Sequence, residues 1–228
     1  MKIKFVYFDA GGTLVRTAEP VGITYSKVAS HYGFQADADE LTLSFARVWK
    51  QLMQRDPEAN GISRVEDDRR WWKEVVRQTW EPFALPPHFP FDDYFMEVYE
   101  AYGRADLWRV YADVEDALQL ASEKGIRIGV LSNWDRRLPG ILEGLDLLHR
   151  FESVVISSEH GVEKPNRKIF DLAREKVGFT ESEMGYLGDE ERADGQGARG
   201  AGWRCEIVRR PEFDLLAALE KLLTESLN

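Results

Sequence analysis

The spacing of apolar residues divides the chain into two kinds of segment. Between residues 16 and 108, apolar side chains recur three or four positions apart, as they do on one face of an amphipathic helix. Residues 39–55 show the pattern most clearly, with one apolar face made by Leu41, Phe45, Val48, Trp49 and Leu52. The pattern predicts four helices in this segment, at residues 21–32, 39–55, 63–80 and 91–102.

Breaker residues support these boundaries. Gly33 follows the first predicted helix, and Asp56-Pro57 ends the second. The third begins at Ser63, and Glu66 stands three positions later, which is the spacing of a capping box. Four tryptophans in this segment (Trp49, Trp71, Trp72 and Trp80) are expected to build a small helical core.

From residue 110 onward, short β-rich runs alternate with helical ones. Strands are expected at residues 126–131, 153–156, 184–187 and 205–208, and helices at 114–124, 138–148, 169–177 and 213–227. Residues 4–8 form a further apolar strand at the start of the chain. This alternation is typical of an α/β domain with a mainly parallel sheet. Because the first strand belongs to this sheet, the helical segment is an insertion, giving a core of residues 1–15 and 109–228 around a helical domain of 16–108.

Composition narrows the range of partners and locations. The chain has 228 residues, a formal net charge of −10 and a pI near 5.0, which argues against nucleic acid or an anionic membrane as a partner. A single cysteine, Cys205, excludes an internal disulfide and fits a reducing compartment. Neither a signal peptide nor an apolar run of about 20 residues is visible. We therefore expect a cytoplasmic protein.

Asp9 is the first candidate for chemistry. It ends the opening apolar strand, and Gly11 and Gly12 then break that strand. A carboxylate at the carboxyl end of a buried strand lies where open α/β sheets place their ligands, and glycines let backbone N–H groups approach an anion. Aspartate is equally common as a cap of such a turn. The stretch alone leaves both interpretations open.

Polar residues at other strand ends favour the functional interpretation. Ser132 follows one predicted strand, and Asp189 follows another, with Asp194 five residues later. Lys164 lies in a loop between them. If the strands are parallel, these side chains meet Asp9 at one edge of the sheet. Carboxylates suit a hard cation such as Mg²⁺, and hydroxyl and ammonium groups suit phosphate or carboxylate oxygens.

These motifs resemble the four motifs of the haloacid dehalogenase (HAD) superfamily. They are Asp9 with Gly12-Thr13-Leu14, then Leu131-Ser132-Asn133, Lys164-Pro165, and Gly188-Asp189 with Asp194. The resemblance covers essentially the whole chain. It implies a Rossmann-like core with an inserted subclass I helical cap. The stretches 70–72 and 132–138 are similar to one particular branch of the superfamily.

The resemblance implies a role for each motif residue. Asp9 is the expected nucleophile, which takes up a phosphoryl group that water then releases. Mg²⁺ is the expected cofactor, held by Asp9, the carbonyl of Gly11, Asp189 and Asp194. Ser132 and Lys164 are the other expected catalytic residues, and Gly12, Thr13 and Asn133 are expected to bind the substrate, a phosphorylated small molecule. A monomer and a homodimer are both compatible with the sequence.

Gly11 departs from the superfamily's usual phosphatase pattern. HAD phosphatases usually carry a second aspartate two residues after the nucleophile, which protonates the leaving group. Glycine cannot move a proton, so a substrate with a good leaving group is favoured: an acyl or aryl phosphate, or a phosphonate that yields a stabilised carbanion. Metal-independent 2-haloacid dehalogenases also lack that aspartate, and dehalogenation is the first alternative. A weakly active or non-catalytic fold that binds a ligand or partner through its cap is the second.

The sequence predicts that Gly11→Asp raises activity on alkyl phosphates, because it restores a proton donor. General acid catalysis contributes roughly 10²–10⁴-fold to such reactions. Turnover of an alkyl phosphate by the variant and by the wild type measures the effect. An unchanged rate, with the metal still bound, would contradict this account of Gly11.

Overall fold

The computed structural model describes residues 2–54 and 67–224, and the chain divides into two compact units. One unit comprises Met1–Arg16 and Arg109–Asn228, and the other comprises Thr17–Trp108. Two short strands, β2 (Val15–Thr17) and β3 (Trp108–Val110), lie where the chain leaves the first unit and returns to it, and they pair as a two-stranded sheet. The sequence did not predict either strand.

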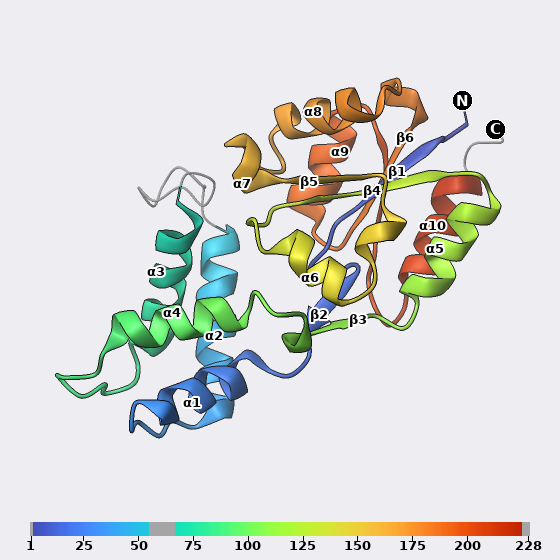
Figure 1. Ribbon diagram of the computed structural model, residues 1–228. Coiled ribbons are helices and arrows are strands. Elements are labelled where there is room, and N and C mark those ends of the chain that lie inside the picture. Colours follow the sequence, from blue (N-terminus) through green and yellow to red (C-terminus); the bar gives the residue numbers. More distant parts are fainter. Residues whose placement is uncertain (1, 55–66, 225–228) are drawn as a thin grey trace. The chain divides into compact units, whose positions relative to one another are not determined.

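A parallel sheet forms the centre of the first unit (Figure 1). Among the described residues it has the order β5-β4-β1-β6-β7. The strands are β1 (Phe5–Phe8), β4 (Arg127–Ser132), β5 (Ser153–Ile156), β6 (Met184–Gly188) and β7 (Arg204–Ile207). All four strand pairings are parallel. The predicted α/β fold with a parallel sheet is therefore confirmed.

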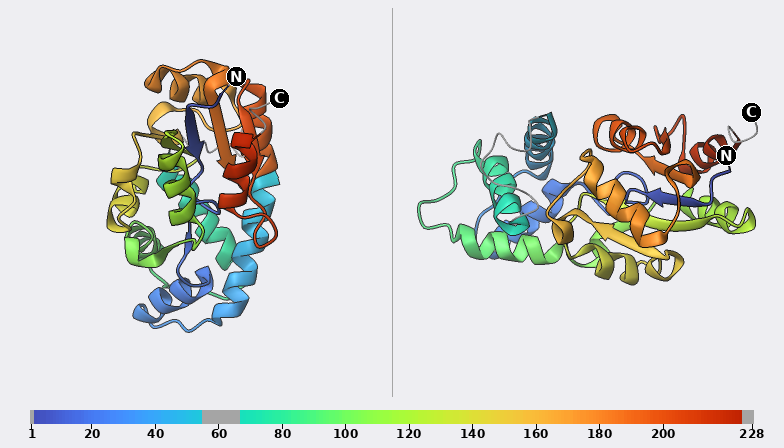
Figure 2. Two further views of the ribbon diagram at one scale, coloured as in Figure 1. Left: turned by 90° about the vertical axis from the view of Figure 1, so that its right-hand side faces the viewer. Right: turned by 90° about the horizontal axis from the view of Figure 1, so that it is seen from above.

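Strand β1 occupies the middle of this sheet because it is apolar on both faces. Its four residues are fully buried, as expected of a strand covered by helices on both sides. Phe5 and Tyr7 face a cluster that includes Phe170 of α8 (Arg167–Val177). Val6 faces the opposite side, where Leu222 of α10 (Leu215–Thr224) lies near Gly185. The two further views show helices on both sides of the strands (Figure 2).

The register of the sheet aligns three strand ends. Phe8 is paired with Val130 of β4 and with Leu187 of β6. Asp9, Ser132 and Asp189 follow these positions by one or two residues, so they emerge at the same edge.

The remaining elements of this unit are α5 (Val114–Glu123), α6 (Leu138–Gly144), α7 (Ser157–His160), α9 (Gly197–Gly200), α10 (Leu215–Thr224), the 3₁₀ turns η3 (Leu148–Arg150) and η4 (Glu181–Glu183), and the π-helix η5 (Glu191–Gln196).

The second unit is helical in its described part. It contains α1 (Val21–His31), α2 (Ala38–Gln54), α3 (Asp68–Trp80), α4 (Phe91–Ala101) and the 3₁₀ turn η2 (Ala105–Leu107). Trp71 and Trp80 are buried, and the Trp80 indole N–H donates to the Tyr94 hydroxyl at 2.9 Å. The expected tryptophan-rich helical core is thus confirmed.

Most predicted helix boundaries lie within one or two residues of the structure, but two differ by four or five residues. Helix α3 begins at Asp68, and the side chain of Asp67 accepts a hydrogen bond from the backbone N–H of Arg70 as its N-cap. The predicted capping box of Ser63 and Glu66 lies outside the described residues. The helix predicted at 138–148 ends at Gly144, because Asp146 adopts a left-handed conformation with φ 59°.

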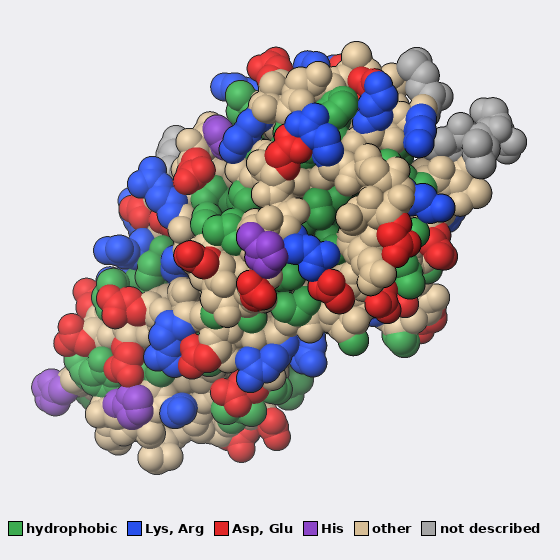
Figure 3. Space-filling model, turned by 45° about the vertical axis from the view of Figure 1, so that its right-hand side comes forward, with side chains coloured by type: hydrophobic (Ala, Val, Ile, Leu, Met, Phe, Trp, Pro, Cys, Tyr) green, Lys and Arg blue, Asp and Glu red, His purple; other side chains and the backbone are tan. Residues whose placement is uncertain are grey.

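Surface charge is mixed where it can be seen. On the face drawn in Figure 3, Lys and Arg side chains are interspersed with Asp and Glu rather than gathered into the basic stripe typical of nucleic-acid surfaces. Within the described part of the chain, no helix combines the length and the apolar character that a membrane span requires. The expected cytoplasmic location stays a prediction.

Candidate active site

Asp9 lies at the centre of the site, directly after β1. Its backbone N–H donates to the carbonyl of Leu187 at 2.8 Å, which ties it to β6, and the residue is 8% exposed. The chain then turns back on itself, since the N–H groups of Leu14 and Val15 both donate to the carbonyl of Ala10, at 2.8 and 2.9 Å. This turn fixes the Asp9 side chain at the edge of the sheet.

Gly12 is required in this turn for two reasons. Its φ is 77°, a left-handed conformation that L side chains rarely adopt. A Cβ at this position would also lie 2.2 Å from Oδ2 of Asp189. The absent side chain therefore makes room for a carboxylate. The predicted contact of Gly12 with a substrate stays a prediction.

Lys164 joins the buried carboxylates. Its Nζ donates to Oδ1 of Asp9 at 2.8 Å, to Oδ1 of Asp194 at 2.6 Å and to the hydroxyl of Tyr186 at 2.6 Å. Lys164 is 3% exposed and Asp194 is 1% exposed. The three donors of the ammonium group are thus matched by three acceptors. Contact between Lys164 and a substrate oxygen requires exchange of one of them.

Burial and charge act in opposite directions on this cluster. Burial alone would lower the pKa of Lys164, but the charges of Asp194 and Asp9 outweigh it and raise that pKa above its usual value. Burial raises the pKa of Asp9, and Lys164 opposes this rise. Lys164 therefore stays protonated and balances part of the negative charge.

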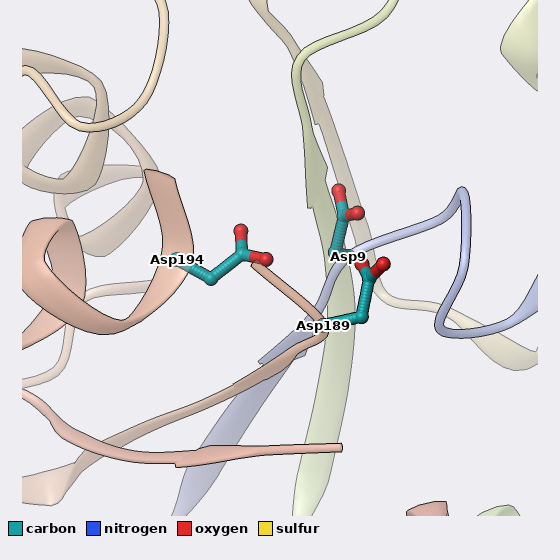
Figure 4. Close-up of side chains that lie close together, drawn as sticks. All are labelled: Asp9, Asp189 and Asp194. Carbon is teal, nitrogen blue, oxygen red and sulfur yellow. The ribbon is translucent and has the colours of Figure 1, made fainter. Parts of the chain in front are cut away.

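Asp189 completes a group of three carboxylates (Figure 4). One oxygen from each of Asp9, Asp189 and Asp194 lies within 4.8 Å of the others. Asp189 is exposed, unlike the other two, and its Oδ1 accepts a hydrogen bond from the Thr13 hydroxyl at 3.3 Å. Although the residue as a whole is exposed, desolvation of its carboxylate and the charges of Asp9 and Asp194 raise the pKa of Asp189 to about 7. The group thus carries more negative charge than Lys164 balances.

A π-helix positions the third carboxylate. Asp194 belongs to η5, and its Oδ2 accepts a hydrogen bond from the backbone N–H of Glu190 at 2.9 Å. Its Oδ1 faces Lys164 and also accepts from Tyr186 at 3.1 Å. Single turns of π-helix occur frequently at functional sites. Here the wide turn brings Asp194 back toward the end of β6.

Ser132 and Asn133 connect β4 to the same cluster. Ser132 is buried, and a hydrogen bond with its side chain lowers the pKa of Asp9, against the effect of burial. The side chain of Asn133 donates to the carbonyl of Lys164 at 2.9 Å and accepts from its N–H at 2.7 Å. Asn133 thus holds the backbone of Lys164. Its predicted role in substrate binding stays a prediction, as does that of Thr13, which is fully buried.

Three neighbours of the cluster were missed by sequence reasoning. Tyr186 could have been noticed as a polar ring on a buried strand that ends at the motif residue Asp189. Arg210 donates to the carbonyls of Gly12 and Thr13, both at 2.8 Å, and nothing in its local sequence indicates this. Trp134 follows the second motif directly, and its ring lies beside Gly11.

Gly11 and Trp134 are in close contact. A Cβ at position 11 would lie 3.1 Å from Cζ3 of the indole, which is tighter than most carbon contacts of this kind. An aspartate there requires the ring to shift by a few tenths of an ångström. The Gly11→Asp variant is therefore best compared with the same change in a Trp134→Ala background.

A known protein family and several curated relatives match most of the chain. A profile of haloacid dehalogenase-like hydrolases matches residues 3–202. The chain belongs to this family. Among curated relatives, haloacid dehalogenase-like hydrolase domain-containing protein 3 of Danio rerio is 30% identical over 210 residues, covering 92% of this chain and 86% of the relative. The Homo sapiens protein of that name is 29% identical, with 93% and 84% coverage. The similarity of residues 70–72 and 132–138 to one branch of the superfamily is thus confirmed by relatives that match most of the chain.

Solved structures of the family confirm the fold. L-2-haloacid dehalogenase from Xanthobacter autotrophicus matches with a TM-score of 0.69 at 21% identity, covering 91% of this chain and 78% of that one. A HAD phosphatase from Thermococcus onnurineus matches with 0.65 at 22% identity, covering 99% and 98%. A dehalogenase and a phosphatase thus match about equally well. The fold alone does not choose between the two reactions.

We predict that Lys164→Met lowers the free energy of unfolding by about 3–5 kcal/mol at pH 7, because it leaves buried carboxylates unpaired. The loss should shrink as the pH falls toward 5. Without Lys164, the pKa of Asp9 in the folded state rises further above its unfolded value, so the folded variant gains a proton and stability at lower pH. Urea unfolding between pH 5 and 8 measures both effects.

Lys168→Met is the matched control, since Lys168 is exposed on α8 of the same unit. Its effect should stay within about 0.5 kcal/mol. Equal losses for the two variants, or a Lys164→Met loss that grows toward low pH, would contradict the electrostatic account.

Proposed function

We propose that this family member is a Mg²⁺-dependent hydrolase that transfers a phosphoryl group from a small molecule to Asp9 and then to water. The observation that carries the proposal is the excess of negative charge at the sheet edge. Three carboxylates, of Asp9, Asp189 and Asp194, lie together, and one ammonium group contacts two of them. If all three carboxylates ionise, two negative charges remain after pairing with Lys164, and a divalent cation would neutralise them.

The donor set fits magnesium. All candidate ligands are oxygens, which Mg²⁺ prefers, and magnesium sites commonly use one or two carboxylates together with substrate phosphates. Asp9, the carbonyl of Gly11 and Asp189 would hold the ion, and Asp194 would support it. When bound, Mg²⁺ supplies positive charge against the oxygens of the transferring group. The raised pKa of Asp189 supports the proposal, because desolvation raises it and the charges of Asp9 and Asp194 raise it further, by more than Lys164 lowers it.

The chain's own residues account for the two chemical steps. An Asp9 carboxylate oxygen forms a bond to phosphorus, and the bond to the leaving group breaks with its electron pair on that group. Water then attacks the same phosphorus atom, which releases phosphate and restores Asp9. Lys164 holds Asp9 in place through the 2.8 Å contact with Oδ1. Ser132 is placed beside Asp9 to donate to the transferring group.

The substrate of this proposal is a phosphate compound whose leaving group departs without a proton. Position 11 carries no side chain that could donate one. We further propose that the division expected from the sequence is functional: residues 1–15 and 109–228 form the catalytic core, and 16–108 form a cap that selects the substrate. The two compact units, Met1–Arg16 with Arg109–Asn228 and Thr17–Trp108, support this division.

Dehalogenation is the second candidate. It is favoured by Gly11, because 2-haloacid dehalogenases resemble this chain in lacking an acid at that position. In that reaction, an Asp9 oxygen would displace halide from carbon, and water would hydrolyse the resulting ester. The close placement of Asp189 and Asp194 favours the magnesium-dependent reaction instead.

We expect hydrolysis of an aryl or acyl phosphate to require Mg²⁺ and to stop with EDTA. Asp9→Asn should lower kcat by at least about 10³-fold, because the amide is a poor nucleophile. Asp146→Asn is the control, since that side chain is 97% exposed and asparagine tolerates its left-handed backbone. Metal-independent release of halide from a 2-haloacid, without phosphatase activity, would show that the protein is a dehalogenase instead.

We also predict that Mg²⁺ binds about tenfold more tightly at pH 8 than at pH 6. A carboxyl group with a pKa of about 7 is mostly protonated at pH 6, and the cation must displace that proton. Calorimetry in two buffers of different ionisation enthalpy measures both the affinity and the proton release. Equal affinity at the two pH values, with no proton released at pH 6, would contradict this assignment of Asp189.

A further inference from the structure

Trp134 places an aromatic ring beside Gly11, two residues after the proposed nucleophile Asp9. The three indole atoms nearest to a Cβ built at Gly11 are Cζ3, Cη2 and Cε3, at 3.1, 3.9 and 4.0 Å. All three belong to the six-membered ring. That ring therefore borders the space into which a side chain at position 11 would project.

The backbone of Trp134 is fixed from both sides. Its N–H donates to the carbonyl of Ser132 at 2.9 Å. Its carbonyl accepts from the Ser157 hydroxyl at 3.2 Å and from the N–H of Ser158 at 3.3 Å. Hydrogen bonds thus join the tryptophan to the end of β4 and to the start of α7.

The residues that follow Trp134 anchor the same loop. Asp135 is buried, and both of its carboxylate oxygens accept hydrogen bonds from the guanidinium of Arg137, at 2.8 and 2.6 Å. The indole itself is half-buried. A backbone held in this way limits how far the ring can move, so that a flat partner binds it with less loss of conformational entropy.

We propose that Trp134 is a specificity residue that stacks on a planar aromatic leaving group, so that the preferred substrates are aryl phosphates. The inference rests on the proposed function and narrows its substrate class. Position 11 has no side chain that could donate a proton, and the Trp134 ring lies beside the space that such a side chain would occupy. A phenolic leaving group fits both, because it spreads its negative charge over a ring and presents a flat face for stacking.

The chemical step balances without an added acid. An oxygen of Asp9 forms the new bond to phosphorus. The phosphorus–oxygen bond of the ester breaks, and its electron pair leaves on the phenolate oxygen. The phenolate takes a proton from solvent after it departs. Water then attacks phosphorus, and the bond between phosphorus and Asp9 breaks with its electron pair on the carboxylate oxygen. The proton released by water passes to solvent, inorganic phosphate leaves and Asp9 is restored.

Binding of two phosphonates tests the stacking without any turnover. Phenylphosphonate and cyclohexylphosphonate carry rings of similar size, but only the first is planar and aromatic. With Mg²⁺ present, calorimetry should show the wild type binding phenylphosphonate roughly fivefold more tightly. Trp134→Phe should retain most of this preference, and Trp134→Leu should reduce it to less than twofold.

A merely structural role for Trp134 gives a different result. In that case Trp134→Leu weakens both ligands equally, and the preference for the planar ring persists. That outcome would overturn the proposal, as would a wild type without any preference. Thermal unfolding of the variants shows whether each one is folded.

A kinetic comparison separates this inference from the proposed function. An aryl phosphate and a polyfluoroalkyl phosphate are chosen so that their leaving alcohols are equally acidic. Trp134→Leu should lower kcat/KM for the aryl ester about fivefold and change that of the alkyl ester less than twofold.

The two experiments distinguish failure of the stacking proposal from failure of the proposed function. If the wild type hydrolyses both esters but Trp134→Leu affects them equally, the stacking proposal fails and the function stands. If the wild type prefers phenylphosphonate but hydrolyses no phosphate ester, the function fails and the aromatic subsite stands. Binding of neither phosphonate would overturn both.

Discussion

The site depends on one buried ammonium group among carboxylates. Lys164 is almost inaccessible to solvent, and it contacts Asp9, Asp194 and Tyr186 within 2.8 Å. Burying a charge is unfavourable unless it is paired, so the lysine and its acidic partners stabilise one another. The amide of Asn133 fixes the lysine's backbone. Strands β1, β4 and β6 all end at this cluster, and the charge that remains there is the reason to expect a divalent cation.

A second group of contacts holds the turn after Asp9. The guanidinium of Arg210 donates to the carbonyls of Gly12 and Thr13, pairs with Asp113 at 2.9 Å, and lies 3.9 Å from the centre of the Tyr111 ring. Asp113 also accepts from the N–H of Leu215 at the start of α10. A segment near the C-terminus therefore supports the turn after Asp9. The free energy of these contacts helps to keep the turn in one conformation.

Much of this arrangement could be predicted because it depends on local pattern and on parallel pairing. Apolar runs located the strands, and their parallel order implied that Asp9, Ser132 and Asp189 emerge together. Tyr186 could not be placed in the cluster, since its partners Lys164, Asp194 and the carbonyl of Leu131 come from three separate parts of the chain. Arg210 acts across 197 or more positions of sequence, which no local pattern reports. The early end of α6 at Gly144 depends on a left-handed residue, Asp146, which periodicity does not detect.

The account can be tested most directly by trapping the acyl phosphate on Asp9. Borohydride added during turnover of an aryl phosphate reduces an aspartyl phosphate to an alcohol. Cleavage after Lys4 and Arg16 then releases residues 5–16, in which Asp9 is the single acidic side chain. The account predicts that the reduced residue is found in this peptide and depends on Mg²⁺. Continued turnover with an unmodified 5–16 peptide, or reduction of a carboxylate elsewhere, would contradict it.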